Sequence, residues 1–366
     1  MVRVKTSGVT KMENHNYIKE AERLTEISQG IDDYYLWVLC GVGLPANIMT
    51  IVTILTMQAM TPATFFVTCL AYFDGSALLA KLVIKLLIHH ATSYLNVLCV
   101  MEFIPIFLQT VANWMLVFIC VERFISVCYP LKKVYLVTKR RSYICAAVVV
   151  TGFLVFFASV FGVMRRNQGL KCTMYPAFAW FWDEVWKWIL CCLLIFFPFV
   201  SILGLTIAII RGLRNSSRDR RSLLRKGSGS VTNASGHQRS SAINERQIAE
   251  AERLERTITL MMVLAAILFL VFSLPSGVYF LMPRQSDGIE YYRQFLLGQV
   301  QYLLLDTTHA LNFFLYFFTA KRFRSQLIKI VCCKKCRKRF RKRNKLNTKT
   351  GKKQSLSLTE ITHVGT

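Results

Sequence analysis

Acidic residues are scarce in this sequence. Its 366 residues include 20 Asp and Glu against 46 Lys and Arg, which gives a net charge of +26. Such an excess of positive charge is found in proteins that bind nucleic acid. Here, however, long stretches carry almost no charge, and a few short stretches carry most of the Lys and Arg. This segregation favours a membrane protein with basic connecting loops and argues against nucleic acid as a partner.

The sequence also lacks the motifs of enzymes and metal sites. It shows no metal-binding spacing of Cys and His, no nucleophile elbow and no Gly-rich phosphate loop. We therefore expect no enzymatic activity, no cofactor and no metal. The first 33 residues lack the basic, apolar and small-residue order of a cleavable signal peptide. The first apolar helix is then expected to act as the targeting segment.

Seven long apolar stretches are present. A membrane core of roughly 30 Å is crossed by about 20 helical residues. The stretches that reach this length are 34–57, 64–90, 99–127, 143–164, 186–210, 257–282 and 294–319. Each must be helical, because lipid offers the backbone no hydrogen-bond partners. The sequence thus predicts an all-α membrane protein built as a bundle of seven transmembrane helices.

Basic residues predict the orientation of this bundle. Lys and Arg concentrate in the links 128–142 and 211–256 and in the segment after residue 320, which lie on one side if there are seven spans. We expect that side to be cytoplasmic and the segment 1–33 to be extracellular, with the chain in the plasma membrane. One detail disagrees, because the N-terminal segment holds five basic residues and the link 58–63 holds none. The link 211–256 is rich in Arg, Ser and Gly, and we expect it to be disordered.

The expected outer loops contain just two cysteines, Cys99 and Cys172. The oxidising outside favours a disulfide between them, which would join the second outer loop to the top of the third helix. Two free thiols are the alternative. A multi-pass transporter is the alternative for the whole chain, although we find neither an inverted repeat nor helices interrupted in corresponding halves.

Polar residues inside the spans are candidates for function, because a charge in lipid is costly unless it faces a partner. Asp74 lies deep in the second span, and Asp306 and His309 lie in the seventh. Lys81 is deep enough to need an acidic partner, for which Asp306 and Glu102 are both candidates. Lys85 is closer to the outer boundary, where its amine can extend to water. His309 is more simply explained as a hydrogen-bonded core residue than as a ligand.

An acidic residue and an arginine end the third span in ICVERFISVCYP. Together with seven spans, the outer cysteine pair and an Asn-x-x-x-Tyr sequence at the end of span seven, this pair resembles the rhodopsin-like (class A) G-protein-coupled receptors over residues 34–331. The stretch VERFISVCYPLK is further similar to the peptide-receptor branch, especially the invertebrate receptors for FMRFamide-type neuropeptides.

The resemblance implies roles for matching residues. Glu122, Arg123 and Phe124 stand where the family has Asp-Arg-Tyr, and Asn312 and Tyr316 stand where it has Asn-Pro-x-x-Tyr. The polar anchors and pivots of the helices are matched by Asn47, Asp74, Pro198, Phe269 and Pro275.

The resemblance also implies a switch. Arg123 would contact Glu255, at the cytoplasmic end of helix six, and this contact would hold helices three and six together at rest. Activation would break the contact, move helix six outward and expose Arg123 to a heterotrimeric G protein. Arrestin and receptor kinases are further implied partners. An arginine that merely marks the inner membrane boundary is the alternative.

Several positions depart from the family pattern. Ser273 replaces the aromatic switch residue of helix six, Thr206 replaces a tyrosine of helix five, and Phe313 replaces the proline of helix seven. These departures leave open an orphan receptor that signals weakly or without a ligand.

The outer half suggests the class of ligand. Amine receptors carry an aspartate at the position of Pro105, so the resemblance argues against an amine. The ligand-binding candidates combine charges with aromatic rings: Lys85, Glu102, Gln109, Asp183, Tyr279, Tyr302 and Asp306. This mixture suits a peptide better than a lipid, and the basic end of a peptide could meet Glu102, Asp183 or Asp306.

A short amphipathic eighth helix is expected after span seven, with Phe323 on its apolar face. The basic cytoplasmic tail 332–366 follows and opens with three cysteines, Cys332, Cys333 and Cys336. We expect these to be palmitoylation sites that anchor the tail to membrane lipid together with the polybasic stretch RKRFRKR. Unmodified thiols are the alternative.

Overall fold

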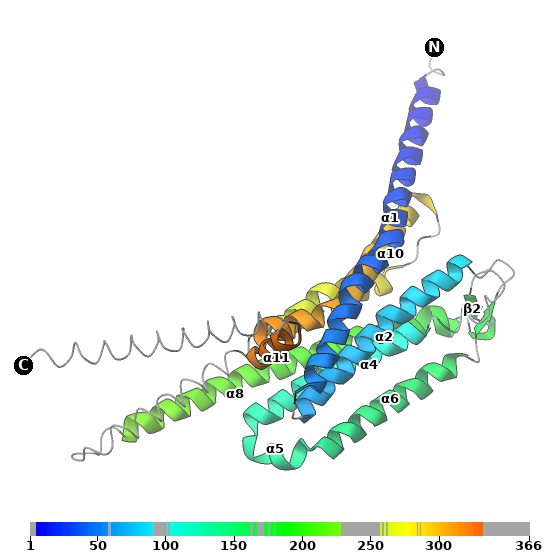
Figure 1. The fold of residues 1–366 in the computed structure, drawn as a ribbon. Coiled ribbons are helices and arrows are strands. Elements are labelled where there is room, and N and C mark those ends of the chain that lie inside the picture. The colour runs from blue at the N-terminus through cyan, green and yellow to red at the C-terminus, as the bar shows by residue number, and fades with distance from the viewer. Residues whose placement is uncertain are drawn as a thin grey trace, which may run out of the picture.

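The computed structural model describes residues 5–57, 60–90, 101, 103–161, 164–166, 172–174, 176–178, 180–227, 257, 260, 263–283, 285 and 287–331. Long helices dominate this part of the chain, and Figure 1 shows them running side by side. They are α1 (Lys5–Leu55), α2 (Pro62–His90), α4 (Phe103–Cys128), α6 (Lys139–Phe161), α8 (Phe197–Gly227) and α10 (Gly288–Thr319), with the helix Val263–Leu281 between the last two.

Shorter elements connect these helices. α5 (Pro130–Leu136) follows α4, and α11 (Lys321–Val331) follows α10. After α6, the strands β1 (Met164–Arg166) and β2 (Cys172–Met174) pair antiparallel, with Met164 opposite Met174. The fifth span is entered through η2 (Pro176–Phe178), η3 (Phe181–Trp186), α7 (Lys187–Cys191) and η4 (Cys192–Phe196), of which η3 and η4 are π-helical.

Six of the described helices are long and apolar enough to cross a membrane. They are His15–Leu55, Pro62–Ile88, Phe103–Cys128, Lys139–Ser159, Glu184–Asn215 and Val263–Leu281, and each overlaps one of the first six predicted spans. The seventh predicted span, 294–319, lies inside the 32-residue helix α10. α10 is less apolar because it carries residues such as Gln301, Asp306 and His309, which are buried in the bundle.

The first helix is much longer than predicted. A span was expected from residue 34, but α1 begins at Lys5 and runs for 51 residues. Residues 17–29 contain no Pro or Gly, and eight of these thirteen residues are Glu, Lys, Arg, Ala, Leu or Gln, all of which favour helix. Ala21 and Ser28 are buried, and Arg293 of α10 lies 2.9 Å from Glu20. The N-terminal half of α1 extends beyond the other helices in Figure 1.

The fifth span also continues further than predicted. We expected disorder over the whole link 211–256, and this is wrong for its first part, because α8 is helical as far as Gly227. Leu213 is buried against the bundle, and the following Arg- and Leu-containing sequence has good helix propensity. The stretch 228–256 lies outside the described residues.

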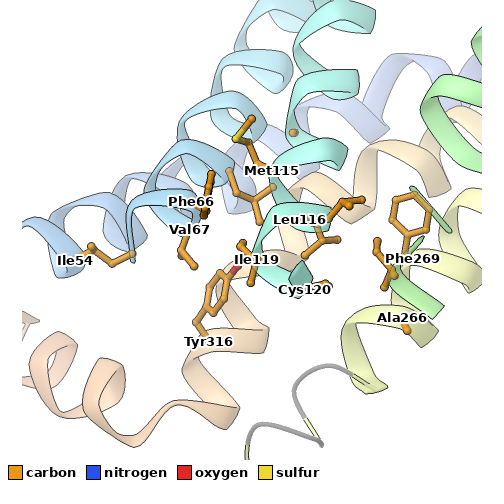
Figure 2. Packing of buried hydrophobic residues seen from close by; sticks show 14 of the residues in the cluster. Ile54, Phe66, Val67, Met115, Leu116, Ile119, Cys120, Ala266, Phe269 and Tyr316 are labelled. Atoms are coloured by element: carbon orange, nitrogen blue, oxygen red, sulfur yellow. The ribbon is translucent and has the colours of Figure 1, made fainter. Parts of the chain in front are cut away.

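The core is centred on α4. In the most apolar stretch of α4, 56% of the residues are buried, whereas in that of α6 only 17% are buried. α4 is therefore central in the bundle and α6 is peripheral. Figure 2 shows Met115, Leu116 and Ile119 of α4 between Phe66 of α2 and Phe269 of the helix Val263–Leu281. In lipid, close packing rather than exclusion of water stabilises such a cluster, so its shape is important.

Gly43 lies where α1 comes close to α2 and α10. A Cβ atom built at this position would lie 2.6 Å from Leu78 Cδ1 and 3.0 Å from Ala310 Cβ. A small residue is therefore required where α1 crosses α2 and α10, as is common between membrane helices.

Candidate functional site

A buried polar cluster joins α1, α2 and α10. Asp74 Oδ1 lies 2.7 Å from His309 Nδ1, and Asp74 Oδ2 accepts a hydrogen bond from Asn312 Nδ2 at 2.7 Å. Asn47 Nδ2 donates to the backbone carbonyl of His309 at 3.0 Å. Positions 309 and 312 are neighbours on one face of a helix, so both side chains reach the same carboxylate. The interpretation of His309 as a hydrogen-bonded core residue is confirmed.

A second polar cluster lies about one turn closer to the N-terminal end of α10. Asp306 is buried, and its Oδ1 contacts Lys81 Nζ and accepts a hydrogen bond from Gln109 Nε2 at 2.7 Å. Lys81 Nζ also lies 5.9 Å from the centre of the Tyr302 ring. Of the two acids considered for Lys81, the structure identifies Asp306. Its other oxygen, Oδ2, has no hydrogen-bond partner in the described part of the chain.

Lys85 makes a separate pair closer to the surface. Its Nζ lies 3.2 Å from Asp32 Oδ2 and 5.9 Å from the centre of the Tyr35 ring. Among the ligand-binding candidates, Gln109, Tyr302 and Asp306 thus come together around Lys81, and Lys85 lies in the neighbouring pair.

The remaining ligand-binding candidates are not part of this cluster. A Cβ atom built at Gly298 would lie 2.8 Å from the Tyr279 hydroxyl, so Tyr279 packs where α10 has no side chain. Glu102 and the side chain of Asp183 lie outside the described residues.

Asn113 and Trp114 form contacts that the sequence did not reveal. Asn113 Nδ2 donates to the carbonyl of Leu194 at 2.9 Å, and Trp114 Nε1 donates to that of Leu193 at 3.1 Å. Pro198 has no N–H, so it cannot bond Leu194 in α-helical geometry or Leu193 in the π-helical geometry of η4. Two side chains of α4 replace that missing donor. The missing N–H of Pro198 predicts that a backbone carbonyl one turn earlier lacks a partner. Only the packing of α4 identifies Asn113 and Trp114 as the side chains that bond there.

The C-terminal end of α4 carries the predicted acid–Arg pair. Glu122 Oε2 lies 3.4 Å from Arg123 Nε, and Glu122 Oε1 lies 3.6 Å from Lys133 Nζ and 2.9 Å from Ser126 Oγ. The Glu122 side chain is 4% exposed and that of Arg123 is 31% exposed. Although sequence neighbours point in different directions on a helix, these two side chains do meet.

The proposed partner of Arg123 on helix six, Glu255, lies outside the described residues, so that contact stays a prediction. Phe124 packs against Tyr129, with 5.7 Å between the ring centres.

The end of α10 is packed against the core and against α11. Tyr316 is buried, and in Figure 2 its ring lies beside Ile119. Phe323 of α11 lies 6.2 Å from Tyr316 and 5.9 Å from Phe313 between ring centres. Phe323, the aromatic residue expected on the apolar face of a short helix after span seven, is therefore the one that packs α11 against α10. That α11 lies along a membrane stays a prediction.

The other predicted positions are distributed as follows. Phe269 is buried in the core cluster, and Pro275 is half-buried in the same helix. The side chains of Cys99 and Cys172 and the three cysteines of the tail lie outside the described residues. Within the described ranges, no group of three or more His, Cys, Asp or Glu could hold a metal ion.

A family model provides the comparison with known proteins. The model described as 7 transmembrane receptor (rhodopsin family) matches residues 46–317. This range contains both polar clusters, the acid–Arg pair and Tyr316. A search of curated proteins found no match.

Proposed function

Because the chain belongs to the rhodopsin family of seven-transmembrane receptors, we propose that it binds an extracellular peptide and activates a heterotrimeric G protein through helix six. The family makes the chain a multi-pass membrane receptor, and members of this family are receptors rather than enzymes. The ligand class, the orientation and the switching mechanism are the proposal.

The observation that carries this proposal is that α4 and α10 each run from the outer polar cluster to the inner end. α4 carries Gln109 and Arg123, which are separated by fourteen residues, or about 21 Å along a helix. α10 carries Asp306 and Tyr316. A ligand that disturbs Asp306 therefore acts on two rigid helices that both reach the inner end.

The outer cluster favours a ligand with several polar groups. Asp306 is neutralised by Lys81 and hydrogen-bonded by Gln109, so a simple ammonium would have to displace an existing cation. Pro105, at the position where amine receptors carry an acid, is buried and offers no charge. A peptide can supply a cation for Asp306, an anion for Lys81 and rings for Tyr302 together. Glu102 and Asp183 are proposed to extend this site.

The inner end supplies the switch. Arg123 is partly exposed and is held at 3.4 Å by Glu122, which also faces Lys133. We place Glu255 opposite Arg123 in the resting state. A ligand that binds more tightly to the state without this contact would shift the receptor toward it. Helix six would then move outward, and Arg123 would meet the G protein.

A second candidate is ligand-independent signalling. Ser273 and Thr206 stand at altered switch positions, are buried, and have hydroxyl groups without a hydrogen-bond partner among the described residues. Buried polar groups without partners weaken a helix interface. They would lower the barrier to activation in the absence of any ligand.

A G-protein dissociation assay with and without a peptide library tests both candidates. We expect dissociation only with certain peptides, a loss of the response in Arg123→Ala, and a large loss of peptide potency in Asp306→Lys and Glu102→Lys. An exposed charge far from the cluster, Lys329→Glu on α11, is the control and should leave peptide potency unchanged. Unaltered potency after both acids are reversed would refute the ligand site. Equal dissociation without any peptide would favour the second candidate.

The membrane-facing parts of the proposal follow from charge and chemistry. α11 buries Phe323 and Leu327, and its exposed Lys321 and Arg322 face anionic lipid if the basic side is cytoplasmic. Palmitoylation of Cys332, Cys333 and Cys336 would then anchor the tail. Arrestin and receptor kinases would bind the same side.

A disulfide between Cys99 and Cys172 is proposed at the opposite side, and mass spectrometry of unreduced peptides tests it.

A further inference from the structure

The charge of Asp74 has an internal partner. Its carboxylate is completely buried, and a buried carboxylate without a partner is strongly destabilising. Among the described residues, the ion pairs of the α2–α10 interface match one base to each acid: Lys81 to Asp306, and His309 to Asp74. Because Lys81 is paired with Asp306, His309 is the remaining base in this interface that can supply a positive charge to Asp74.

The hydrogen bonds around Asp74 favour its ionised form. Both carboxylate oxygens face nitrogen atoms at 2.7 Å, one from the His309 ring and one from the Asn312 amide. The Asn312 amide donates to one oxygen, and His309 Nδ1 donates to the other when it carries a hydrogen. Two such donors stabilise a carboxylate over a carboxylic acid. An ionised Asp74 in a dry site then requires that the ring beside it carries the proton as an imidazolium.

His309 lines a small cavity. His309 Nε2 is buried without a hydrogen-bond partner in the described part of the chain. The ring lines a cavity of about 20 Å³, together with Asn113, Thr308 and Asn312. A volume of about 10–15 Å³ holds one water molecule if polar groups surround it. An imidazolium donates from both ring nitrogens, so a water in this cavity would accept the second N–H.

We propose that the Asp74–His309 pair is a proton-binding site, in which an imidazolium at His309 is the counter-ion of Asp74 and a single buried water accepts its Nε2–H. The proton replaces any inorganic cation as the charge that balances Asp74. The pair then stabilises the contact between α2 and α10, and the hydrogen bond from Asn47 to the His309 carbonyl links α1 to the same site. Removal of the proton leaves Asp74 without a counter-charge and weakens the contact between these helices.

Few other ionisable groups surround this site. In the described residues, Lys81 and Asp306 lie outward from the pair, and Cys120 and Tyr316 lie inward on α4 and α10. α1 contributes the amide of Asn47, and the helix Val263–Leu281 contributes the apolar Ala265 and Phe269 to the cavity.

Nuclear magnetic resonance of the full chain in lipid nanodiscs, with ¹⁵N-labelled histidine, tests the proposal. The chain has six histidines, and His309→Gln identifies the relevant signal, with the exposed His15→Gln as the matched control. We expect both nitrogens of His309 to be protonated at neutral pH and to exchange slowly with water. A neutral ring beside Asp74 would overturn the proposal.

The variant Asp74→Asn gives a second measurement on a chain that retains His309. Without the carboxylate, the His309 signal should change to that of a neutral ring. A signal unchanged from that of the native chain would show that Asp74 does not hold the proton, and the proposal would be wrong.

If a variant fails to fold, a second experiment decides the question on the unmodified chain. Replacement of sodium by a bulky organic cation should leave its thermal midpoint unchanged, whereas a clear drop would favour an inorganic cation. None of these measurements needs a ligand or a G protein, so they are independent of the proposed function.

Discussion

Asp74 and Glu122 are both buried acids, but their surroundings differ. Asp74 is 0% exposed and faces a histidine whose side chain is only 2% exposed. Glu122 is 4% exposed, and its two cations, Arg123 and Lys133, are 31% and 45% exposed. A pair closed off from water is costly to break, whereas a pair whose cations reach water can exchange partners. The Asp74–His309 pair is therefore suited to hold two helices in a fixed position, and the pairs of Glu122 are suited to a switch.

The largest effect is expected from Asp74→Ala. This change removes the ion-pair partner of His309, whose ring must then lose its proton inside the bundle, and it also removes the acceptor of Asn312. We expect a loss of about 3–5 kcal/mol in unfolding free energy, as for other buried pairs with one member deleted. Thermal unfolding in nanodiscs measures it. A loss no greater than that of Glu122→Ala would remove the distinction between the two acids.

Asn113→Leu tests a buried contact without a charge. The leucine has a similar size but cannot donate to the Leu194 carbonyl that Pro198 leaves free. An unsatisfied buried carbonyl costs about 1–3 kcal/mol, so the unfolding free energy should fall by that amount. The double variant with Pro198→Ala, which restores the backbone donor, should recover part of the loss. No recovery would mean that the asparagine acts elsewhere.

Glu122→Gln should change signalling more than stability. The glutamine keeps the shape and the contact with Ser126 but no longer attracts Arg123 or Lys133. Because both cations are partly hydrated, we expect a loss of no more than about 1 kcal/mol. G-protein dissociation without ligand should rise. Lys133→Gln is the control for the loss of one cation, and it should leave basal dissociation closer to that of the native chain.

The smallest effect is expected at the pair between the two extended helices. Arg293 and Glu20 are each half-exposed, and the hydrogen bond from Arg293 to Glu20 raises the pKa of the guanidinium. Water and salt screen such a pair. Arg293→Gln should leave the thermal midpoint unchanged and increase hydrogen exchange only in residues 15–30. A lower midpoint would show that the outer part of α1 is part of the folding core.

The length of the apolar runs predicted most of the bundle. Because lipid offers the backbone no hydrogen-bond partners, each run must be helical, and all seven spans could be located from their apolar length. Six of them match apolar helices of the structure that are long enough to cross a membrane, and the seventh lies inside α10. The same reasoning could not locate the start of α1 or the end of α8, because these extensions are polar. These extensions make tertiary contacts: Ala21 is buried, Glu20 pairs with Arg293 of α10, and Leu213 belongs to the core cluster.

The candidate site was predicted in part for a similar reason. A buried acid demands a partner, so the sequence could narrow the partner of Lys81 to two acids. It could not choose between them, nor could it identify His309 as the partner of Asp74, because both choices depend on how α10 is rotated against α2. The contact between Asn113 and Leu194 was missed because an asparagine has no fixed partner until two helices are placed together.

Sequence alone determined that this chain forms a membrane bundle with basic ends, since hydrophobic length and charge act locally along the chain. It also supplied the residues that had to be paired. Tertiary structure alone decided which acid meets which base, because that depends on the rotation and the depth of each helix, and a shift of one residue turns a side chain by about 100°.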